Sequence, residues 1–290
     1  DLDRDLEAIQ VCFSDFLEEV VPSRATNQLG GLAREKGWGL HTYSSFLADL
    51  SEDEYVKLHF PQRIKNYDIF NFVTLNFNFT SLLDNYLYLD KKYDRHPFAT
   101  SDTNFQFHIN PRNYKLKDDK PDSESGSSAY LLTNIYHPHG VQQVPRSLLF
   151  GVDEGTSNRT TFEKPFWAQH HRYYEDLIKH TDLFIIFGSS MGQTDRWWWK
   201  RILERIGESE AEAIIYKYDH CASLSKKDTC DKVRRDFIEQ NFPGSPVNPT
   251  LSASQLQRRI AVVPYSDPQT LTAFGFCPAP FEMDTQHLYN

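Results

Sequence analysis

Apolar residues recur every three or four positions over residues 2–20, which is the spacing of one face of an amphipathic helix. Pro22 follows, and a proline ends a helix because it has no amide hydrogen to donate. We therefore expect a helix at the start of the chain. The residues that carry this pattern are Leu2, Leu6, Ile9, Phe13, Phe16, Leu17 and Val20.

The sequence after this helix is mostly polar. Residues 23–38 contain three glycines and show no apolar periodicity, whereas residues 42–50 have the pattern of a short helix. We expect residues 1–67 to form a helical N-terminal part of the same domain as the rest of the chain.

Short apolar runs rich in Phe, Val, Ile and Thr begin at residue 68, and such runs are typical of buried strands. Thr80 can cap a helix after the first run. Helical patterns also cover residues 166–180 and the stretch after Thr194. Strands that alternate with helices indicate a parallel sheet covered by helices, hence an α/β domain over residues 68–290. The predicted strands are 68–79, 129–136, 147–150, 183–187, 211–219 and 259–267.

One part of this domain departs from the alternating pattern. Residues 115–128 are charged, rich in serine and nearly free of apolar side chains, so they form a solvent loop. We assign this loop to a helical or irregular insertion around residues 88–128.

Composition excludes several classes of protein. The chain has 31 Lys and Arg against 40 Asp and Glu, and 31 − 40 = −9, so direct nucleic-acid binding is disfavoured. No apolar stretch reaches the roughly 18–20 residues that cross a bilayer. The four cysteines form no CxxC pair, which favours reduced thiols and a cytoplasmic location, although Cys221 and Cys230 could close a disulfide.

Polar residues and glycines follow four of the predicted strands, and ligands of open parallel sheets bind at the carboxyl ends of strands. Alternation places the amides of Asn76 and Asn78 on one face, where they could contact a ribose or a water; alternatively they cap a helix or tie adjacent loops. The candidate site residues are Thr74, Asn76, Asn78, His139, Gly140, Gly151, Asp153, Gly188, Ser189, Ser190 and Asp195.

His139 is the candidate general base, because imidazole titrates near neutrality. A structural histidine is the alternative, and the nearby His137 could be the functional one. Gly188 to Ser190 could hold a phosphate or ribose between a strand and a helix, or could simply be a tight turn. Asp195 could equally be a first-turn residue that the helix dipole stabilises. A metal site formed by His137, His139, Asp153 and Asp195 has no recognised ligand spacing.

The blocks TLNFNFTSLLDNYL, IYHPHG, LLFGVDE and FGSSMGQTDRWW, in this order, resemble the bacterial AbiH family of phage abortive-infection proteins. The resemblance covers most of the chain, and residues 187–198 are its most specific part. The same blocks are similar to those of sirtuin-like NAD-binding domains, which implies a sirtuin-like Rossmann-type sheet. In that comparison Thr74, Asn76 and Asn78 fall on the first nucleotide-binding element, His139 on the catalytic histidine and Gly188 to Ser190 on the nucleotide-binding turn.

Three positions depart from these families. An upstream strand and glycine loop that would hold the pyrophosphate are not visible in the sequence given. Asn78 stands where sirtuins carry an acid, and Ser189 replaces a histidine of the AbiH block. Sirtuin deacetylases also carry a four-cysteine zinc ribbon, which this chain cannot build.

The resemblance therefore implies an antiphage effector that hydrolyses NAD to nicotinamide and ADP-ribose on infection, rather than a deacetylase. It implies that His139 takes a proton, that Asn76 holds the reacting group in line, and that no metal takes part. It further implies a phage-derived trigger or a partner defence protein, and a homo-oligomer. The alternatives are a nucleotide-binding sensor without catalysis and a metal-dependent nuclease or phosphoesterase.

Overall fold

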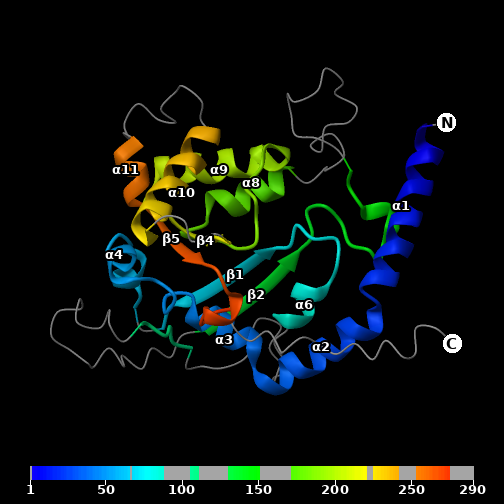
Figure 1. Ribbon diagram of the computed structural model, residues 1–290, viewed down its shortest axis with the longest axis horizontal. Helices are drawn as coiled ribbons and strands as arrows, with labels where there is room; N and C mark the ends of the chain where they lie inside the picture. The colour runs from blue at the N-terminus through cyan, green and yellow to red at the C-terminus, as the bar shows by residue number, and fades with distance from the viewer. Residues whose placement is uncertain are drawn as a thin grey trace.

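Helices precede the first strand, as the apolar spacing at the start of the sequence predicts. The computed structural model describes residues 2–65, 67–87, 105–110, 130–150, 171–220, 225–241 and 253–274. Within that part of the chain, the helices before the first strand are α1 (Leu2–Val20), α2 (Ser23–Lys36), α3 (Trp38–Ser45), α4 (Glu52–Tyr55) and α5 (Phe60–Arg63) (Figure 1).

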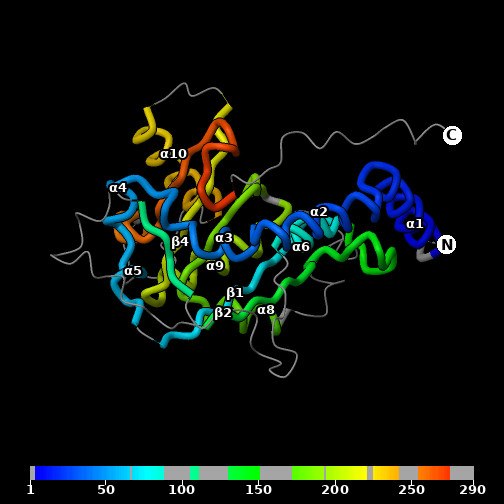
Figure 2. Tube along the Cα trace, turned by 90° about the horizontal axis from the view of Figure 1, so that it is seen from below, coloured from blue at the N-terminus to red at the C-terminus, as the bar shows by residue number. Residues whose placement is uncertain are grey.

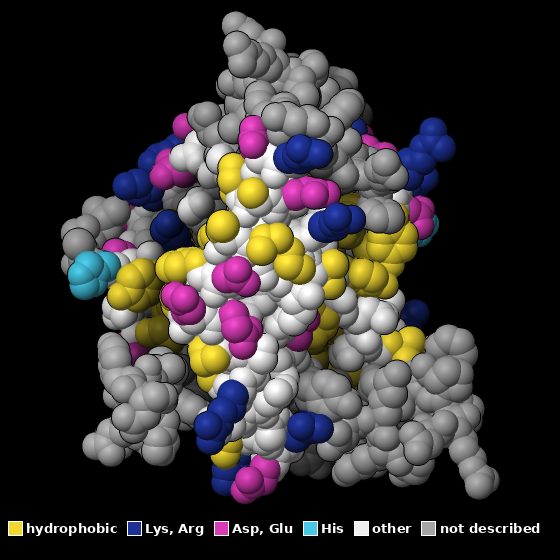
Figure 3. Space-filling view, turned by 90° about the vertical axis from the view of Figure 1, so that its right-hand side faces the viewer, with side chains coloured by type: hydrophobic (Ala, Val, Ile, Leu, Met, Phe, Trp, Pro, Cys, Tyr) yellow, Lys and Arg dark blue, Asp and Glu magenta, His cyan; other side chains and the backbone are white. Residues whose placement is uncertain are grey.

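Only part of the apolar stripe of α1 is buried. The ring of Phe13 makes edge contacts with Phe79 and Phe150, both at 5.4 Å, and Gln10 Nε2 donates to the carbonyl of Leu148 at 2.8 Å. Figure 2 shows α1 at the opposite end of the molecule from α4 and α5. The outer positions are exposed, at 57% for Ile9, 53% for Phe16 and 52% for Val20. Figure 3 shows apolar and acidic side chains together on this face.

Residues 23–38, which sequence patterning leaves without regular structure, form α2 and the start of α3. Gly37 separates the two helices with φ = 67°, and its N–H reaches the carbonyls of Ala33 and Arg34. This left-handed conformation is one that glycine adopts without strain, so a single glycine closes one helix and opens the next.

The strands in the described part of the chain form two parallel sheets, and the parallel α/β prediction is thereby confirmed. One sheet has the order β1-β2 and the other β3-β4-β5. Pairing begins at Ile69 with Tyr130, at Leu183 with Glu212 and at Ala213 with Ile260. The strands are β1 (Ile69–Leu75), β2 (Tyr130–Tyr136), β3 (Leu183–Ile186), β4 (Glu212–Tyr218) and β5 (Ile260–Tyr265).

The two sheets are parts of one layer, although no ladder joins β1 to β3 among the described residues. Phe72 of β1 packs against the same buried cluster as Leu183 and Ile185 of β3. The strands also start on the same side, because Phe60 contacts the ring of Phe70 near the start of β1 and donates its N–H to Glu212 at the start of β4. Parallel strands of both sheets therefore end at a common edge.

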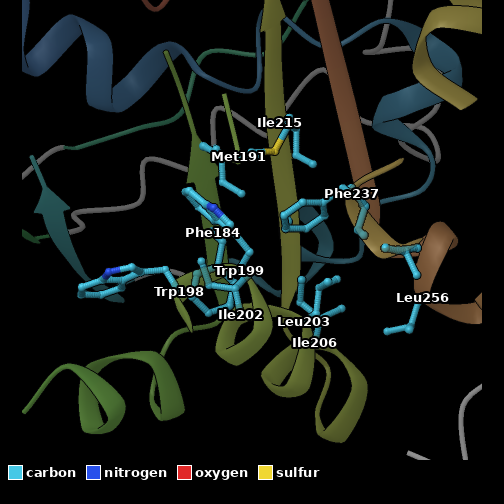
Figure 4. Close-up of a cluster of buried hydrophobic side chains, with 14 of the residues drawn as sticks. Phe184, Met191, Trp198, Trp199, Ile202, Leu203, Ile206, Ile215, Phe237 and Leu256 are labelled. Atoms are coloured by element: carbon cyan, nitrogen blue, oxygen red, sulfur yellow. The ribbon is translucent and has the colours of Figure 1, made fainter. Parts of the chain in front are cut away.

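Helices cover both faces of this layer (Figure 1). The larger core lies between the strands and the helices α8 (His171–Lys179), α9 (Arg196–Glu208) and α10 (Lys226–Asn241). Figure 4 shows how β3, β4 and α9 fill it with large apolar side chains. Its members include Phe184, Ile186, Trp198, Trp199, Leu203, Ile206, Ile215 and Phe237.

Two predicted segments differ from the structure. Residues 148–150 are not a strand; they follow a 3₁₀ turn at Pro145–Ser147 and are apolar because α1 packs on them. Within the predicted insertion, Phe105, Phe107 and Ile109 pack on the core, and Phe105 is 3% exposed. The charged segment 115–128 lies outside the described residues.

Among the described residues, no helix has both the length and the hydropathy that a membrane span needs. The described cysteines, Cys12 and Cys230, are free thiols, and Cys221 lies outside the described residues.

Candidate functional site

Three strand ends meet where the polar residues gather. β1 continues into a turn that leads to α6 (Leu82–Tyr86), and β2 continues into the turn 137–140. β3 continues through residues 187–195 into α9. The His139 side chain, which follows β2, approaches Asp195, which precedes α9, so this edge brings the two sheets together.

The side chain of Asn76 makes three hydrogen bonds inside this edge of the sheets. Its side chain is buried, at 1% exposed, and Nδ2 donates to the Thr80 carbonyl at 3.2 Å and to Asp84 Oδ2 at 2.9 Å. Its Oδ1 accepts the N–H of Asn78 at 3.0 Å. Both amide hydrogens are thus used to hold the turn against α6, which is the arrangement expected if Asn76 ties adjacent loops. Contact with a ligand would require it to exchange one of these bonds.

Asp84 links Asn76 to His137, which lies 53 positions further along the chain than Asp84. His137 Nε2 lies 2.7 Å from Asp84 Oδ1, and Nδ1 lies 3.3 Å from the carbonyl of Asn78. Both ring nitrogens therefore face acceptors, and only the doubly protonated imidazolium can donate to both.

The electrostatics agree with this geometry. Burial opposes the charged form of His137, but the hydrogen bond and charge of Asp84 outweigh it and raise the pKa of His137 above its ordinary value. Burial likewise works against the Asp84 carboxylate, but the hydrogen bonds from His137 and Asn76 outweigh it, and the pKa of Asp84 is lowered. Asp84 and His137 form a partly buried ion pair.

His139 sits on the other side of the same turn. Gly140 closes the turn by donating its N–H to the His137 carbonyl at 3.0 Å, with φ = 85°. A Cβ at this position would lie 2.0 Å from the carbonyl oxygen of Ser147, so the backbone approach requires glycine. Gly140 therefore serves the shape of the turn.

The imidazole of His139 is buried, at 7% exposed, and its ring lies 5.1 Å from that of Phe77 and 6.3 Å from that of Phe79. Its Nε2 lies 3.2 Å from Asp195 Oδ1, but out of the direction of a hydrogen bond. This nitrogen consequently has no hydrogen-bond partner within the described part of the chain, which is unusual for a buried polar atom.

Residues 187–195 connect β3 to α9 and end in a 3₁₀ turn at Gln193–Asp195. Gly188 and Met191 both have positive φ, 65° and 52°, and the Ser189 hydroxyl accepts the N–H of Met191 at 3.0 Å. Ser190 is exposed. Asp195 stands immediately before α9 without a side-chain cap bond, so it occupies the helix-terminal position considered from the sequence and also faces His139.

The remaining predicted residues are placed less centrally. Thr74 lies on β1, where its hydroxyl is 3.3 Å from the phenol oxygen of Tyr43. Gly151 and Asp153 lie outside the described residues. Within the described ranges, no group of three His, Cys, Asp or Glu side chains could hold a metal ion.

Sequence patterning missed Asp84 and left His137 as a second choice. Asp84 appears in the sequence only as a residue of the helix after Thr80, four positions on. Thr80 precedes α6, which begins at Leu82, so their spacing does not put the two on one helical face and gives no local signal for Asp84.

The fold and these contacts define a class of protein: a parallel α/β domain with a His–Asp edge where its strands end. The chain belongs to the bacteriophage abortive infection AbiH family, whose model matches residues 40–217, more than half of the 290 residues. The matched range contains Asn76, Asp84, His137, His139 and Asp195. Searches among curated proteins and among solved structures gave no significant match. The family places the chain in phage abortive infection.

Proposed function

We propose that this protein acts in abortive infection by cleaving the bond between nicotinamide and ribose in NAD. The observation that carries the proposal is the buried His139, whose Nε2 has no hydrogen-bond partner among the described residues and lies 3.2 Å from Asp195. Such a group at the carboxyl edge of parallel strands can accept a proton from a bound substrate or water.

The chemistry needs one base and a site that holds positive charge. The oxygen of a water molecule attacks C1′ of the nicotinamide ribose, the C1′–N bond breaks, and its electron pair stays with the nicotinamide nitrogen. The water proton passes to Nε2 of His139, and the carboxylate of Asp195 stabilises the imidazolium that forms. Asp195 also stabilises the oxocarbenium-like ribose on the way.

The other predicted residues take supporting roles in this proposal. Gly188, Ser189 and Ser190 hold a ribose or phosphate beside the start of α9. Asn76 orients the turn that carries Asn78, and contacts the nicotinamide ribose if it releases Thr80. The Asp84–His137 pair fixes the turn from which His139 projects, because His137 and His139 are separated by one residue.

An enzyme that destroys NAD must be silent before infection. We therefore propose that turnover depends on a phage-derived trigger, a partner defence protein or assembly of a homo-oligomer in the cytoplasm. Activity is accordingly to be measured with and without a lysate of phage-infected cells.

The test is chromatography of NAD incubated with the purified protein, with His139→Gln and Asp195→Asn beside the parent. His180→Gln and Asp176→Asn are matched controls, because this pair is exposed, at 69% and 71%. Free nicotinamide from the parent and the controls, and at least about a hundredfold less from the site variants, supports the proposal.

Other outcomes separate the alternatives. NAD that binds but stays intact under every condition favours a nucleotide sensor. Cleavage of a nucleic acid or phosphoester that stops on addition of a chelator favours a metal-dependent enzyme. Nicotinamide release that survives His139→Gln removes the assigned base.

A further inference from the structure

Aromatic side chains gather at the carboxyl ends of β3, β4 and β5. Phe187 directly follows β3, Tyr218 ends β4, and Tyr265 ends β5. Tyr218 is 49% exposed and Phe187 38% exposed, and His220 beyond Tyr218 is also exposed. The proton transfer proposed for His139 and Asp195 uses none of them.

These rings are held in place from behind and from the side. Phe187 stacks on Phe274 with centroids 3.9 Å apart and 15° between planes, and lies nearly parallel to Tyr265 at 6.1 Å and 11°. The buried Tyr216 meets Phe187 edge-on at 5.6 Å. Such packing fixes the ring of Phe187 while leaving part of it open.

Tyr218 is similarly supported. It pairs with Tyr265 in the β4–β5 register, and their rings lie 5.5 Å apart. The next residue, Asp219, extends this pairing by donating its N–H to the Tyr265 carbonyl at 2.8 Å. The ring of His220 is nearly parallel to that of Tyr218, at 6.2 Å and 12°. The exposed phenol ring therefore stands on ordered backbone at the edge of the sheet.

Position and chemistry together indicate what such rings receive. Phe187 immediately precedes Gly188, the start of the connection that leads to Asp195, so the aromatic edge adjoins the candidate site. Every nucleobase has a flat face that stacks on an aromatic ring. The Asp219 carboxylate next to Tyr218 accepts a hydrogen bond from the hydroxyl of Thr229 at 3.4 Å, and its negative charge disfavours phosphate at this edge.

We propose that Tyr218, with Phe187 and Tyr265, forms a platform that stacks the adenine of the dinucleotide. This inference rests on the proposed function, because it names where the second half of NAD binds. Nicotinamide and its ribose then lie toward His139, and adenine lies over the ends of β3, β4 and β5.

The experiment measures binding of AMP, ribose 5-phosphate and nicotinamide mononucleotide to the purified protein by calorimetry. Tyr218→Ala removes the ring, and Tyr218→Phe keeps it. Tyr130→Ala is the matched control, because Tyr130 is 45% exposed at the amino end of β2, away from the carboxyl edge. Thermal unfolding verifies that every variant is folded.

We expect Tyr218→Ala to raise the Kd for AMP by roughly 5- to 150-fold, the range for loss of one stacked base. Tyr218→Phe and Tyr130→Ala leave that Kd within about twofold. Binding of ribose 5-phosphate and nicotinamide mononucleotide does not change with Tyr218→Ala, since neither carries adenine.

Failure of this inference can be told apart from failure of NAD cleavage. AMP affinity that is unaffected by Tyr218→Ala, or absent in the folded parent, overturns the platform even where NAD is cleaved. A Tyr218-dependent AMP site in a protein that leaves NAD intact upholds the platform and rejects the glycosidic cleavage.

Discussion

The Asp84–His137 pair yields a prediction in which the sign of the pH dependence can be worked out. Replacing Asp84 by Asn removes the charge but retains two hydrogen-bonding atoms. The new amide can donate to Nε2 of a neutral His137, whose Nδ1–H still donates to the Asn78 carbonyl, while its oxygen still accepts from Asn76. The substitution therefore removes mainly the ionic contribution.

The stabilisation from this pair is confined to a window of pH. The pKa of His137 is raised, so its contribution is complete below its ordinary value of 6.5 and is lost as the pH rises through the raised value. The pKa of Asp84 is lowered, so its contribution is complete above 3.8 and is lost as the pH falls through the lowered value. The full effect lies between about pH 4 and 6.5.

The magnitude follows from the burial of the pair. A hydrogen bond to a charged group contributes about 1.5–3 kcal/mol, and solvent screening reduces this because the Asp84 side chain is 28% exposed. Asp84→Asn should lower the free energy of unfolding by about 1–2 kcal/mol at pH 5.5 and by less than about 0.5 kcal/mol at pH 9. Asp84→Ala should cost about 2–4 kcal/mol at both values, because Asn76 and His137 each lose a partner.

Urea unfolding at the two pH values measures these differences. Asp176→Asn is the control, since its partner His180 is as exposed as Asp176 itself, and we expect a change below about 0.5 kcal/mol. A destabilisation by Asp84→Asn that is equal at pH 5.5 and 9, or larger at pH 9, would refute the assignment of a charged pair.

Two further predictions concern the backbone and a buried ion pair. Gly140→Ala should destabilise the fold by more than about 3 kcal/mol in urea unfolding, because the new Cβ meets the Ser147 carbonyl. Gly188→Ala adds a Cβ in open space at positive φ and should cost about 1–2 kcal/mol. Equal costs for the two variants would contradict the close approach at Gly140. Arg234→Met should lower the free energy of unfolding by about 3–5 kcal/mol, because Arg234 Nη1 donates at 2.6 Å to the buried Glu54. Lys57 Nζ also lies 2.6 Å from Glu54 Oε1, and a neutral result by calorimetry would show that Lys57 suffices to balance the carboxylate.

Local patterns predicted the elements whose signal is local. The amphipathic spacing found α1, and apolar runs bounded by polar residues found all five strands of the two sheets. Residues 23–38 were missed as helix because glycines weaken helix propensity, whereas Gly30 of α2 lies close to Asn85, where an added Cβ would be 2.7 Å from the side-chain Oδ1. The apolar residues 148–150 resembled a strand, but their burial comes from α1.

The site was predictable only as a set of strand ends. Sheet topology brings such ends together, so His139, Asn76 and Asp195 could be named from the sequence. Their partners could not, because Asp84 and His137 are 53 residues apart and the approach of His139 to Asp195 spans 56 positions. Local spacing carries no information about pairs at such separations, and the choice between a satisfied amide and a free one depends on them.

The site also joins two sheets that no described backbone ladder connects. His139 follows the β1–β2 sheet and Asp195 follows the β3–β4–β5 sheet, so among the described residues side-chain packing, and no strand pairing, sets their separation. Phe77 takes part in this packing, because its ring lies 5.1 Å from both His139 and Trp198. Side-chain packing yields more readily than a ladder of backbone hydrogen bonds. The distance between His139 and Asp195 therefore depends on packing between side chains of the two sheets, and any shift of one sheet against the other would change it directly.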